Sequence, residues 1–329
     1  MDASCPSEPA DPSGLAPRTR LGDRVVLRHL LADGSATDVV GWLESVDAEA
    51  ARVRDHAGAL VTVPRARIVA ARRAPAARGG RDPMRTSPAE LEQIAVSGWA
   101  AETEELGEWT LRAGGGFTGR ANSCLAVGDP GVSLAEAAER IVAFADARGA
   151  RPWAQVVDGS AEARGLAGLG WREVYVPTDV LVCRLSELLE RAPGDPRVEV
   201  AAELGPAWLA AYHRSRPAAV EPAVLRRILE GRPPRAFAGV GAADRLIAIG
   251  RGHLREDWLG LASLYTDPDH RRRGWATRVM AALGHWAARQ GARSVYLQVA
   301  AGNRDAAQAY ERLGFRRHHG YHYLAAPGS

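Results

Sequence analysis

WLGLASLYTDPDHRRRGWATRVMAALGHWAA, residues 258–288, decides the fold of this chain. The apolar run Leu259–Thr266 predicts a buried strand, because the Asp267-Pro268 pair that follows it cannot continue a ladder of hydrogen bonds. A helix is predicted next from five apolar residues at helical spacing: Val279, Met280, Leu283, Trp286 and Ala287. Its first N–H groups and the positive end of its dipole come directly after Arg271–Gly274. The sequence therefore predicts a phosphate-binding turn.

Two further patterns lie downstream of this turn. A strand is predicted over Ser294–Val299, and the run NRDAAQAYERLGF follows at residues 303–315. The turn, RRRGWA at 271–276, resembles the R/Q-x-x-G-x-G/A loop of the GNAT superfamily of N-acetyltransferases, and the downstream run is similar to that family's N-x-x-A-x-x-x-Y-x-x-x-G-F signature. The resemblance implies an N-acetyltransferase with acetyl-CoA as its co-substrate and no metal.

The resemblance also assigns roles to residues. The pyrophosphate of acetyl-CoA is expected on the turn, whose members are Arg271, Arg272, Arg273, Gly274, Trp275 and Ala276. In the family, the strand before the turn splays from its neighbour and offers a backbone N–H to the thioester carbonyl. Leu264, Tyr265 and Thr266 hold that place here. Leu264 is accordingly expected to be an oxyanion-type donor, and the three residues together a rail for the pantetheine arm.

Tyr310 is the expected general acid, because a phenol with an ordinary pKa near 10 is neutral at working pH and can protonate a leaving thiolate. The competing interpretation makes Tyr310 and Leu264 ordinary core residues. Asn303 is expected to cap the helix that carries Tyr310 or to contact the coenzyme. The general base stays open among His253, Glu256, Asp257 and a chain of water molecules.

Other polar residues also have two interpretations. Four arginines could bind a carboxylated substrate or only charge the surface: Arg214, Arg216, Arg251 and Arg255. Three histidines crowd a predicted final strand, but alternation places His318 and His322 on one face and His319 on the other, so no three-ligand metal site is expected. Tyr321, His322 and Tyr323 stay open as substrate contacts.

The N-terminal part of the chain has a different texture. Five short strands, predicted at residues 24–30, 37–46, 51–56, 60–63 and 67–70, resemble an SH3-like barrel over 19–72. Residues 1–18 predict a disordered tail, and the basic segment 73–86 predicts a linker. Nucleic-acid contact through the barrel and linker is the alternative, but no aromatic residues interleave with the arginines to favour it.

The middle of the chain repeats its C-terminal part. GARPWAQVV at 149–157 aligns with GARSVYLQV at 291–299, and LGWR at 169–172 aligns with LGFR at 313–316. The first copy has Val127–Gly131 in place of the arginine-rich turn and Leu166 near the place of Tyr310. We therefore predict tandem GNAT folds of α+β or α/β class, with mostly antiparallel mixed sheets flanked by helices. The copy at 87–190 is degenerate and the copy at 191–329 is catalytic.

A second glycine-rich segment, GGGFTG at 114–119, matches G-x-G-x-x-G literally. The dinucleotide-binding fingerprint must open a helix, whereas the residues that follow here read as a strand. The segment is interpreted as a hairpin turn between strands at 108–113 and 120–127. Upstream of it, Ser87 before Pro88 is predicted to cap a helix.

Composition limits the function. The chain has 329 residues, a net charge of +3 and no lysine, which excludes a Walker-type lysine and a Schiff base to pyridoxal phosphate. Three cysteines, Cys5, Cys124 and Cys183, are odd in number and far apart, so neither a disulfide framework nor a zinc knuckle is indicated. No apolar run long enough for a membrane span and no signal-peptide core are present, so a cytoplasmic location is expected.

The whole chain, including GGFTGRANS at 115–123, resembles a group of actinobacterial acetyltransferases, some described as N-acetylglutamate synthases. The resemblance implies a small-molecule amine as the acceptor, an amino acid such as glutamate among them. Two alternatives stay open: an acetyl-CoA-sensing regulatory or nucleic-acid-associated protein, and an acetyltransferase of proteins or peptides. A monomer is expected, because two packed GNAT copies could satisfy the pairing that single-copy relatives achieve as dimers.

Overall fold

The computed structural model describes residues 24–55, 59–74, 81–99, 101–216, 221–242 and 245–328. Contacts divide the chain into two compact units, residues 1–78 with 288–291 and residues 79–287 with 292–329. The predicted disordered tail and the middle of the predicted linker, residues 75–80, lie outside the described residues. Within the described ranges, no helix is long and apolar enough to cross a membrane.

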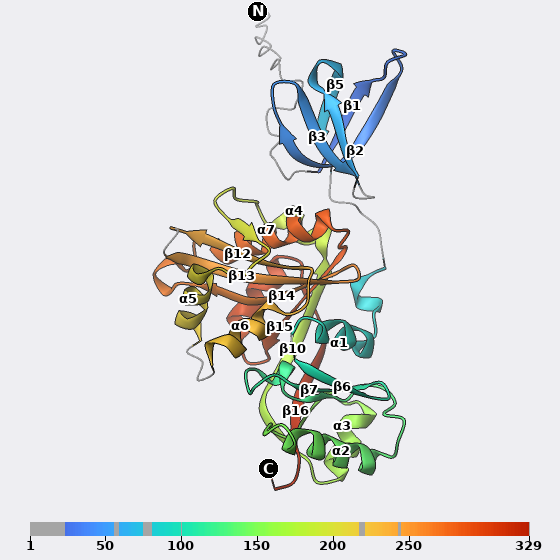
Figure 1. Ribbon diagram of the computed structural model, residues 1–329, viewed down its shortest axis with the longest axis vertical. Helices are drawn as coiled ribbons and strands as arrows, with labels where there is room; N and C mark the ends of the chain where they lie inside the picture. Colours follow the sequence, from blue (N-terminus) through green and yellow to red (C-terminus); the bar gives the residue numbers. More distant parts are fainter. Residues whose placement is uncertain are drawn as a thin grey trace, which may run out of the picture. The chain divides into compact units, whose positions relative to one another are not determined.

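The first unit holds an antiparallel sheet of five strands, drawn in blue in Figure 1. Its strands are β1 (Arg24–Leu30), β2 (Ala36–Val46), β3 (Ala50–Asp55), β4 (Leu60–Pro64) and β5 (Ile68–Arg73). They are ordered β4-β3-β2-β1-β5, and each overlaps one of the five strands predicted from the sequence. Alternating apolar side chains form the core: Val25, Leu27, Leu43, Ala51 and Val53.

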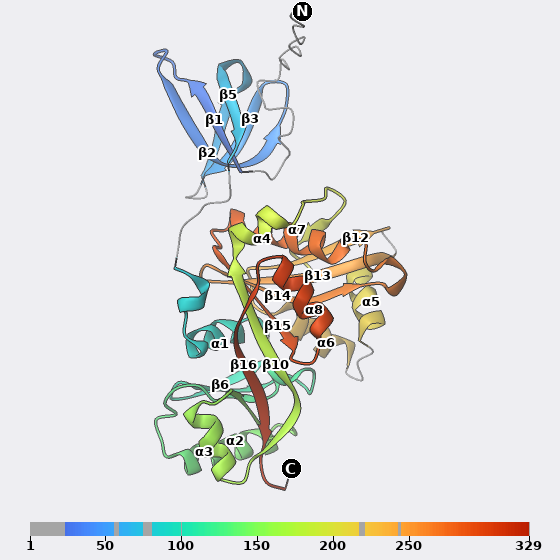
Figure 2. The ribbon, with the colours of Figure 1, turned by 180° about the vertical axis from the view of Figure 1, so that it is seen from behind.

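The second unit is built on one mixed sheet of eleven strands, ordered β11-β12-β13-β14-β15-β10-β16-β9-β8-β7-β6 (Figures 1 and 2). Its first half supplies β6 (Glu102–Leu106), β7 (Trp109–Ala113), β8 (Cys124–Leu125), β9 (Trp153–Val157) and β10 (Arg172–Arg184). Its second half supplies β11 (Glu199–Ala201), β12 (Arg235–Gly241), β13 (Leu246–Arg255), β14 (Trp258–Thr266), β15 (Ser294–Ala300) and β16 (Arg316–Ala325). Only β8–β9 and β14–β15 pair in parallel among these strands.

Helices flank this sheet in both halves. The first half has α1 (Pro88–Val96), α2 (Leu134–Asp146), α3 (Ala161–Gly168) and α4 (Leu185–Arg191). The second has α5 (Pro206–Ser215), α6 (Pro222–Glu230), α7 (Trp275–Arg289) and α8 (Arg304–Arg312). Ser87 caps α1 as predicted: its side chain accepts the N–H of Glu90, and Glu90 accepts the N–H of Ser87 in return.

The two halves exchange their last strands. β10 ends the first half but pairs with β15 of the second, and β16 ends the second half but pairs with β9 of the first. β10 and β16 also pair with each other and run side by side through the middle of the sheet (Figure 2). The sequence boundary at residue 190 therefore separates two repeats but not two sheets.

The repeat predicted from the sequence recurs as a repeated turn, which follows α3 in the first half and α8 in the second. In the first half, the N–H of Trp171 donates to the carbonyl of Leu166 at 3.1 Å. In the second half, the N–H of Phe315 donates to the carbonyl of Tyr310 at 3.1 Å. Leu166 and Tyr310 therefore occupy equivalent places in the two copies.

The turn predicted at residues 114–119 joins two antiparallel strands as expected, because β7 pairs with β8 and Thr110 lies opposite Leu125. The second strand is much shorter than the predicted 120–127, since β8 holds only Cys124–Leu125 and the segment after the glycines is a 3-10 turn at Gly119–Ala121. β7 also forms a hairpin with β6 on its other side.

The cause of the shortened strand is Asn122, whose side-chain oxygen accepts the N–H groups of Gly114 and Gly116, both at 2.8 Å. Its amide donates to Phe117 O at 2.7 Å. One buried side chain thus satisfies backbone groups that a strand would have paired, and the result is a compact loop.

Candidate active site

The strand before the phosphate turn carries a bulge and a splay. β14 pairs with β15 from Trp258 opposite Ser294 to Leu261 opposite Leu297, and the recorded pairing ends there although both strands continue. On its other side, β13 follows β14 to Thr266 with a shift of register. Ser263 lies in this shift with φ 54°, an unfavourable conformation for a residue with a side chain. The strands therefore part beyond Leu261, as the resemblance implied.

The phosphate turn itself has the backbone of an anion site. Arg272 and Gly274 take left-handed conformations, with φ 60° and 76°, and α7 begins at Trp275. Side chains Arg271 to Arg273 are exposed. Successive N–H groups in such a turn, next to a helix N-terminus, form a concave positive surface that suits a phosphate.

Side chains behind the turn hold it in place. Arg278 donates to Arg273 O at 2.6 Å and pairs with Asp195 at 3.1 Å. Arg197 hydrogen-bonds the same carboxylate, which lowers the pKa of Asp195 to about 2. The guanidinium groups of Arg197 and Arg278 lie 4.8 and 5.0 Å from the ring of Trp275. The turn is preorganised before any ligand binds.

A cavity of about 500 Å³ lies where the strands part. From the predicted site it collects Leu264, Tyr265, Asn303 and Tyr310, and no member of the turn at 271–276. The ring of Tyr310 meets that of Phe315 edge-on at 5.9 Å, and burial raises the pKa of Tyr310. Asn303 caps α8, since its side chain accepts the N–H of Ala306 at 3.2 Å.

Sequence reasoning named only three residues of one wall of this cavity as possible substrate contacts, Arg216, Tyr321 and Tyr323, and missed the others. The wall comes from the loop after α1, the glycine-rich loop, β10, α5 and β16: Trp99, Phe117, Thr118, Gly119, Arg120, Tyr175, Val176, Thr178, Tyr212, Ser215, Arg216, Tyr321 and Tyr323. The GGGFTGR run marks the loop residues of this wall, but its sequence predicts only a turn. These residues meet only because β10 and β16 cross between the halves.

The three candidate bases lie away from the cavity. His253 is 4% exposed, and its Nε2 forms a hydrogen bond with the hydroxyl of Tyr296 at 2.7 Å. Burial, with Arg251 nearby, lowers the pKa of His253 to about 3. Glu256 lines a separate groove of about 450 Å³, and Asp257 lines neither the groove nor the cavity.

The four candidate arginines also separate. Arg251 is fully buried and donates to Gly98 O, and burial lowers its pKa to about 10. Arg214 donates to Leu246 O at 2.6 Å, and Arg255 lines the separate groove. Arg216 lines the cavity from an exposed position on its rim.

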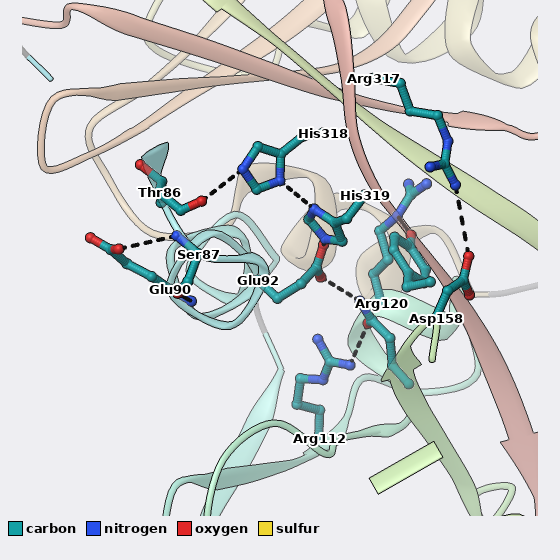
Figure 3. A network of polar contacts seen from close by, with 12 residues as sticks. Thr86, Ser87, Glu90, Glu92, Arg112, Arg120, Asp158, Arg317, His318 and His319 are labelled. Carbon is teal, nitrogen blue, oxygen red and sulfur yellow. Dashed lines mark hydrogen bonds and ion pairs between the residues drawn. The ribbon is translucent and has the colours of Figure 1, made fainter. Parts of the chain in front are cut away.

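Two of the three C-terminal histidines, His318 and His319, belong to a buried polar network (Figure 3). His318 contacts Thr86 O at 2.8 Å and the ring of His319 at 2.7 Å, and His319 contacts Glu92 at 3.0 Å. Glu92 accepts a hydrogen bond from Gln155, whose oxygen accepts one from Arg112 at 2.9 Å. His322 lies apart from the network and pairs with Asp158 at 2.7 Å. The network ties α1 to β16, β9 and β7 behind the cavity.

In the first half, the place of the phosphate turn is closed by the protein's own carboxylates. The N–H of Gly128 donates to Glu162 at 3.2 Å, and the N–H of Asp129 donates to Glu108 at 2.6 Å. Leu166, at the place of Tyr310, is fully buried in the core of that half. The first half has the same scaffold as the second half, but the backbone N–H groups of Gly128 and Asp129 already donate to carboxylates of the protein.

Comparison with known proteins agrees with this geometry. The family model described as "Probable histone acetyltransferase Rv0428c C-terminal" matches residues 87–324, and the model "Rv0428c N-terminal Sm-like domain" matches residues 19–72. The small N-terminal β domain is thus Sm-like in its family description.

Individual relatives are similar to different shares of the chain. The uncharacterized N-acetyltransferase YobR of Bacillus subtilis is 26% identical over 244 residues, 71% of this chain and 96% of that protein. An aminoglycoside N(6')-acetyltransferase of Serratia marcescens is 29% identical over 102 residues, 28% of this chain and 70% of that protein. A solved GCN5-related N-acetyltransferase from Kribbella flavida shares the fold, with a TM-score of 0.53 and 19% identity over 73% of this chain and 96% of that one.

GNAT enzymes transfer acetyl groups from acetyl-CoA, and the splayed strand, the anion turn and the cavity described above fit that use. With a family model covering residues 87–324, this chain belongs to the family described as "Probable histone acetyltransferase Rv0428c C-terminal" and is an N-acetyltransferase of GNAT type.

Proposed function

We propose that this enzyme transfers the acetyl group of acetyl-CoA to the amine of a small molecule by direct attack on the thioester. The observation that supports this most is the single cavity that Leu264, Asn303 and Tyr310 line at the splayed strands. Its volume of about 500 Å³ suits a small substrate with part of a coenzyme arm.

The residues present fit the coenzyme. Two buried polar atoms beside the turn, Thr266 Oγ1 and Trp275 Nε1, have no hydrogen-bond partner among the described residues. Buried polar groups are seldom left so, and a bound ligand would satisfy them. The N–H groups of residues 271–276 would hold the pyrophosphate, and the arginine side chains would add charge-assisted bonds. When bound, acetyl-CoA supplies an acetyl group activated as a thioester.

The chain's own residues then act on that group. The backbone N–H of Leu264 polarises the carbonyl, since the bulge at Ser263 exposes this part of β14 to the cavity. Tyr310 gives its hydroxyl proton to the departing thiolate. Burial raises its pKa, so the hydroxyl carries that proton at neutral pH.

The amine must lose its own proton before attack. The cavity's described lining residues include no aspartate, glutamate or histidine. The amine proton therefore leaves to water, and the reaction draws on the neutral fraction of the acceptor.

Likeness to N-acetylglutamate synthases suggests an amino acid such as glutamate as the acceptor, whereas the family description names histones. The test is thiol release from acetyl-CoA with glutamate, other amino acids, spermidine, an aminoglycoside and a lysine-rich histone peptide. We expect turnover with one small-molecule class. Turnover with the peptide alone would replace the small acceptor by a protein. Silence with every acceptor, with coenzyme binding intact by calorimetry, would favour acetyl-CoA sensing.

A further inference from the structure

We infer that the acetyl acceptor is an amine that carries a carboxylate, and that Arg120 of the degenerate half binds this carboxylate. The inference rests on the proposed function, because it names the acceptor of that transfer.

The first step is the charge of the cavity. Its described lining residues contain two charged side chains, Arg120 and Arg216, and both are cationic. A polyamine, an aminoglycoside or a lysine-rich peptide would bring positive charge into this wall without a carboxylate to meet it. An acceptor with a negative group would instead meet complementary charge. Like charge beside the amine also favours its neutral, reactive form.

The second step is the position of Arg120. Its Nε donates to the hydroxyl of Tyr321 at 2.9 Å, and its guanidinium lies 5.7 Å from the ring of Trp99. Among the described residues, the hydrogen bond of the Arg120 side chain goes from Nε to Tyr321. Its terminal N–H groups are therefore available to bind a ligand in the cavity that Arg120 lines. Two parallel N–H donors match the geometry of a carboxylate.

The third step concerns rigidity. Arg120 follows directly on the glycine-rich loop that Asn122 holds together. Ser123 donates to Gly119 O at 2.7 Å, and Arg112 in turn donates to Ser123 Oγ at 2.8 Å. The Arg120 backbone therefore sits in a preorganised turn, which is the condition for binding a small anion selectively.

The coenzyme does not need this cation. Its pyrophosphate has its own site at the turn 271–276, and no member of that turn lines the cavity. Glu92 of the polar network attracts Arg120 electrostatically, but its hydrogen bonds go to Gln155 and His319 and not to Arg120. Among the described residues, no carboxylate forms an ion pair with either arginine of the cavity.

Six of the other residues of this wall are aromatic: Trp99, Phe117, Tyr175, Tyr212, Tyr321 and Tyr323. Such a surface favours an acceptor with an apolar body beside its carboxylate. The degenerate half thereby has a function in the enzyme, since it supplies part of the acceptor side, including Arg120, of an active site whose coenzyme side belongs to the other half.

The test uses the full chain and matched acceptors: phenylalanine and leucine, each beside its α-amide, and glutamate beside its diamide, with spermidine as a polycation. The α-amide has the more easily deprotonated amine, so a preference for the acid cannot come from amine basicity. We expect wild type to prefer at least one acid over its amide by about 10²-fold in kcat/KM. Arg120→Gln should remove most of this preference through KM and leave activity on amides within about threefold.

Arg120→Lys keeps the positive charge but loses the two parallel N–H donors of the guanidinium, so it should keep part of the preference for acids that Arg120→Gln loses. Arg255→Gln removes an arginine of the separate groove and should leave the preference as in wild type. Coenzyme affinity, measured by calorimetry, should be equal in all variants.

The outcomes separate the two proposals. Higher kcat/KM on amides or spermidine than on every acid, unchanged by Arg120→Gln, would overturn the carboxylate inference and leave acetyl transfer standing. A wild-type preference for acids that survives Arg120→Gln in a folded variant would overturn the assignment of Arg120. No thiol release with any acceptor would reject the proposed function itself. If Arg120→Gln does not fold, the ratio of kcat/KM on acids to kcat/KM on amides, compared between wild type and Arg120→Lys, still tests the assignment of Arg120.

Discussion

Tyr310 and Leu166 hold the same place in two copies of one fold, yet one lines a cavity and the other is fully buried. The carbonyl of each accepts the same turn hydrogen bond, so the backbone does not distinguish them. The difference lies in the side chain and in what surrounds it. A catalytic hydroxyl is needed only where a coenzyme can bind, and the first half has closed that place with Glu108 and Glu162.

Replacing Tyr310 with phenylalanine removes the proposed acid and keeps the ring that packs on Phe315. We expect kcat to fall by about 10²-fold, because the leaving thiolate loses its proton donor. Coenzyme affinity, measured by calorimetry, should not change. Tyr175→Phe removes the same atom from a tyrosine that is 73% exposed at the same cavity, and serves as the matched control. Equal kcat in both variants would reject Tyr310 as the acid.

His253 makes stability depend on pH. Burial and Arg251 lower its pKa to about 3 in the folded protein, whereas an unfolded histidine has a pKa near 6.5. Between those values the unfolded chain binds a proton that the folded chain does not. The free energy of unfolding should therefore fall as the pH is lowered from about 6.5, by at most about 1.4 kcal/mol per pH unit from this residue.

The substitution His253→Gln keeps a partner for Tyr296 OH but cannot titrate. Urea denaturation at a series of pH values should give a shallower acid slope for this variant than for wild type. His213→Gln, on α5, is the control and should keep the wild-type slope. The assignment is wrong if both variants lose stability with acid as wild type does.

At the scale of elements, the turn between β14 and α7 is the proposed coenzyme site, and its backbone conformation is the basis of that proposal. Gly274 takes φ 76° in that turn, and Gly291, after the other end of α7, takes φ 90°. Alanine in a left-handed conformation costs about 1 to 2 kcal/mol at either place. Only Gly274 belongs to the anion turn, so the pair separates a loss of stability from a loss of binding.

We expect Gly274→Ala to weaken CoA binding by about tenfold or more, because the N–H groups of the turn move out of register with a phosphate. Gly291→Ala has nothing within 4 Å of its new methyl group and should lose similar stability with no change in CoA affinity. Titration calorimetry with CoA and thermal unfolding of both variants give the two readings. Wild-type affinity in Gly274→Ala would remove the phosphate turn from the coenzyme site.

At the scale of the molecule, the exchange of β10 and β16 joins the two halves of the second unit. The strands of each half pair with the exchanged strand of the other half, so neither half can unfold its last strand without breaking pairs in both halves. Leu181 lies in β10, opposite Leu297 of β15 and Arg317 of β16, and is 4% exposed. Shortening the Leu181 side chain should therefore leave an empty space that destabilises both halves.

Leu181→Ala should lower the free energy of unfolding of the second unit by about 2 to 5 kcal/mol. Hydrogen exchange should show faster opening in β7 and β13 alike, since one strand serves both halves. Leu27→Ala in the core of the first unit is the control and should leave exchange in β7 and β13 unchanged. Loss of protection in one half alone would mean that the halves unfold independently.

The sequence by itself determined the local elements, the family and the repeat. Strand alternation and turn residues placed the five strands of the first unit, and apolar spacing placed α7, because these patterns depend only on neighbours in the chain. The order of β14, the arginine-rich turn, α7, β15 and α8 identified the GNAT fold. The turn at residues 114–119 was predicted, but the 3-10 turn that shortens the strand after it was not, because the side chain of Asn122 binds the backbone of this loop.

Only the tertiary structure decided which residues share the cavity. Leu264 and Tyr310 were predictable, since both belong to a local signature. Arg120, Trp99 and Tyr321 come from three distant segments that meet where β10 and β16 cross, and no periodicity encodes such a meeting. Burial likewise set His253 apart from the cavity, because desolvation depends on everything packed around a side chain. The sequence therefore predicted the residues of the proposed coenzyme side and a few of the acceptor side, and the tertiary structure decided which residues complete the acceptor side.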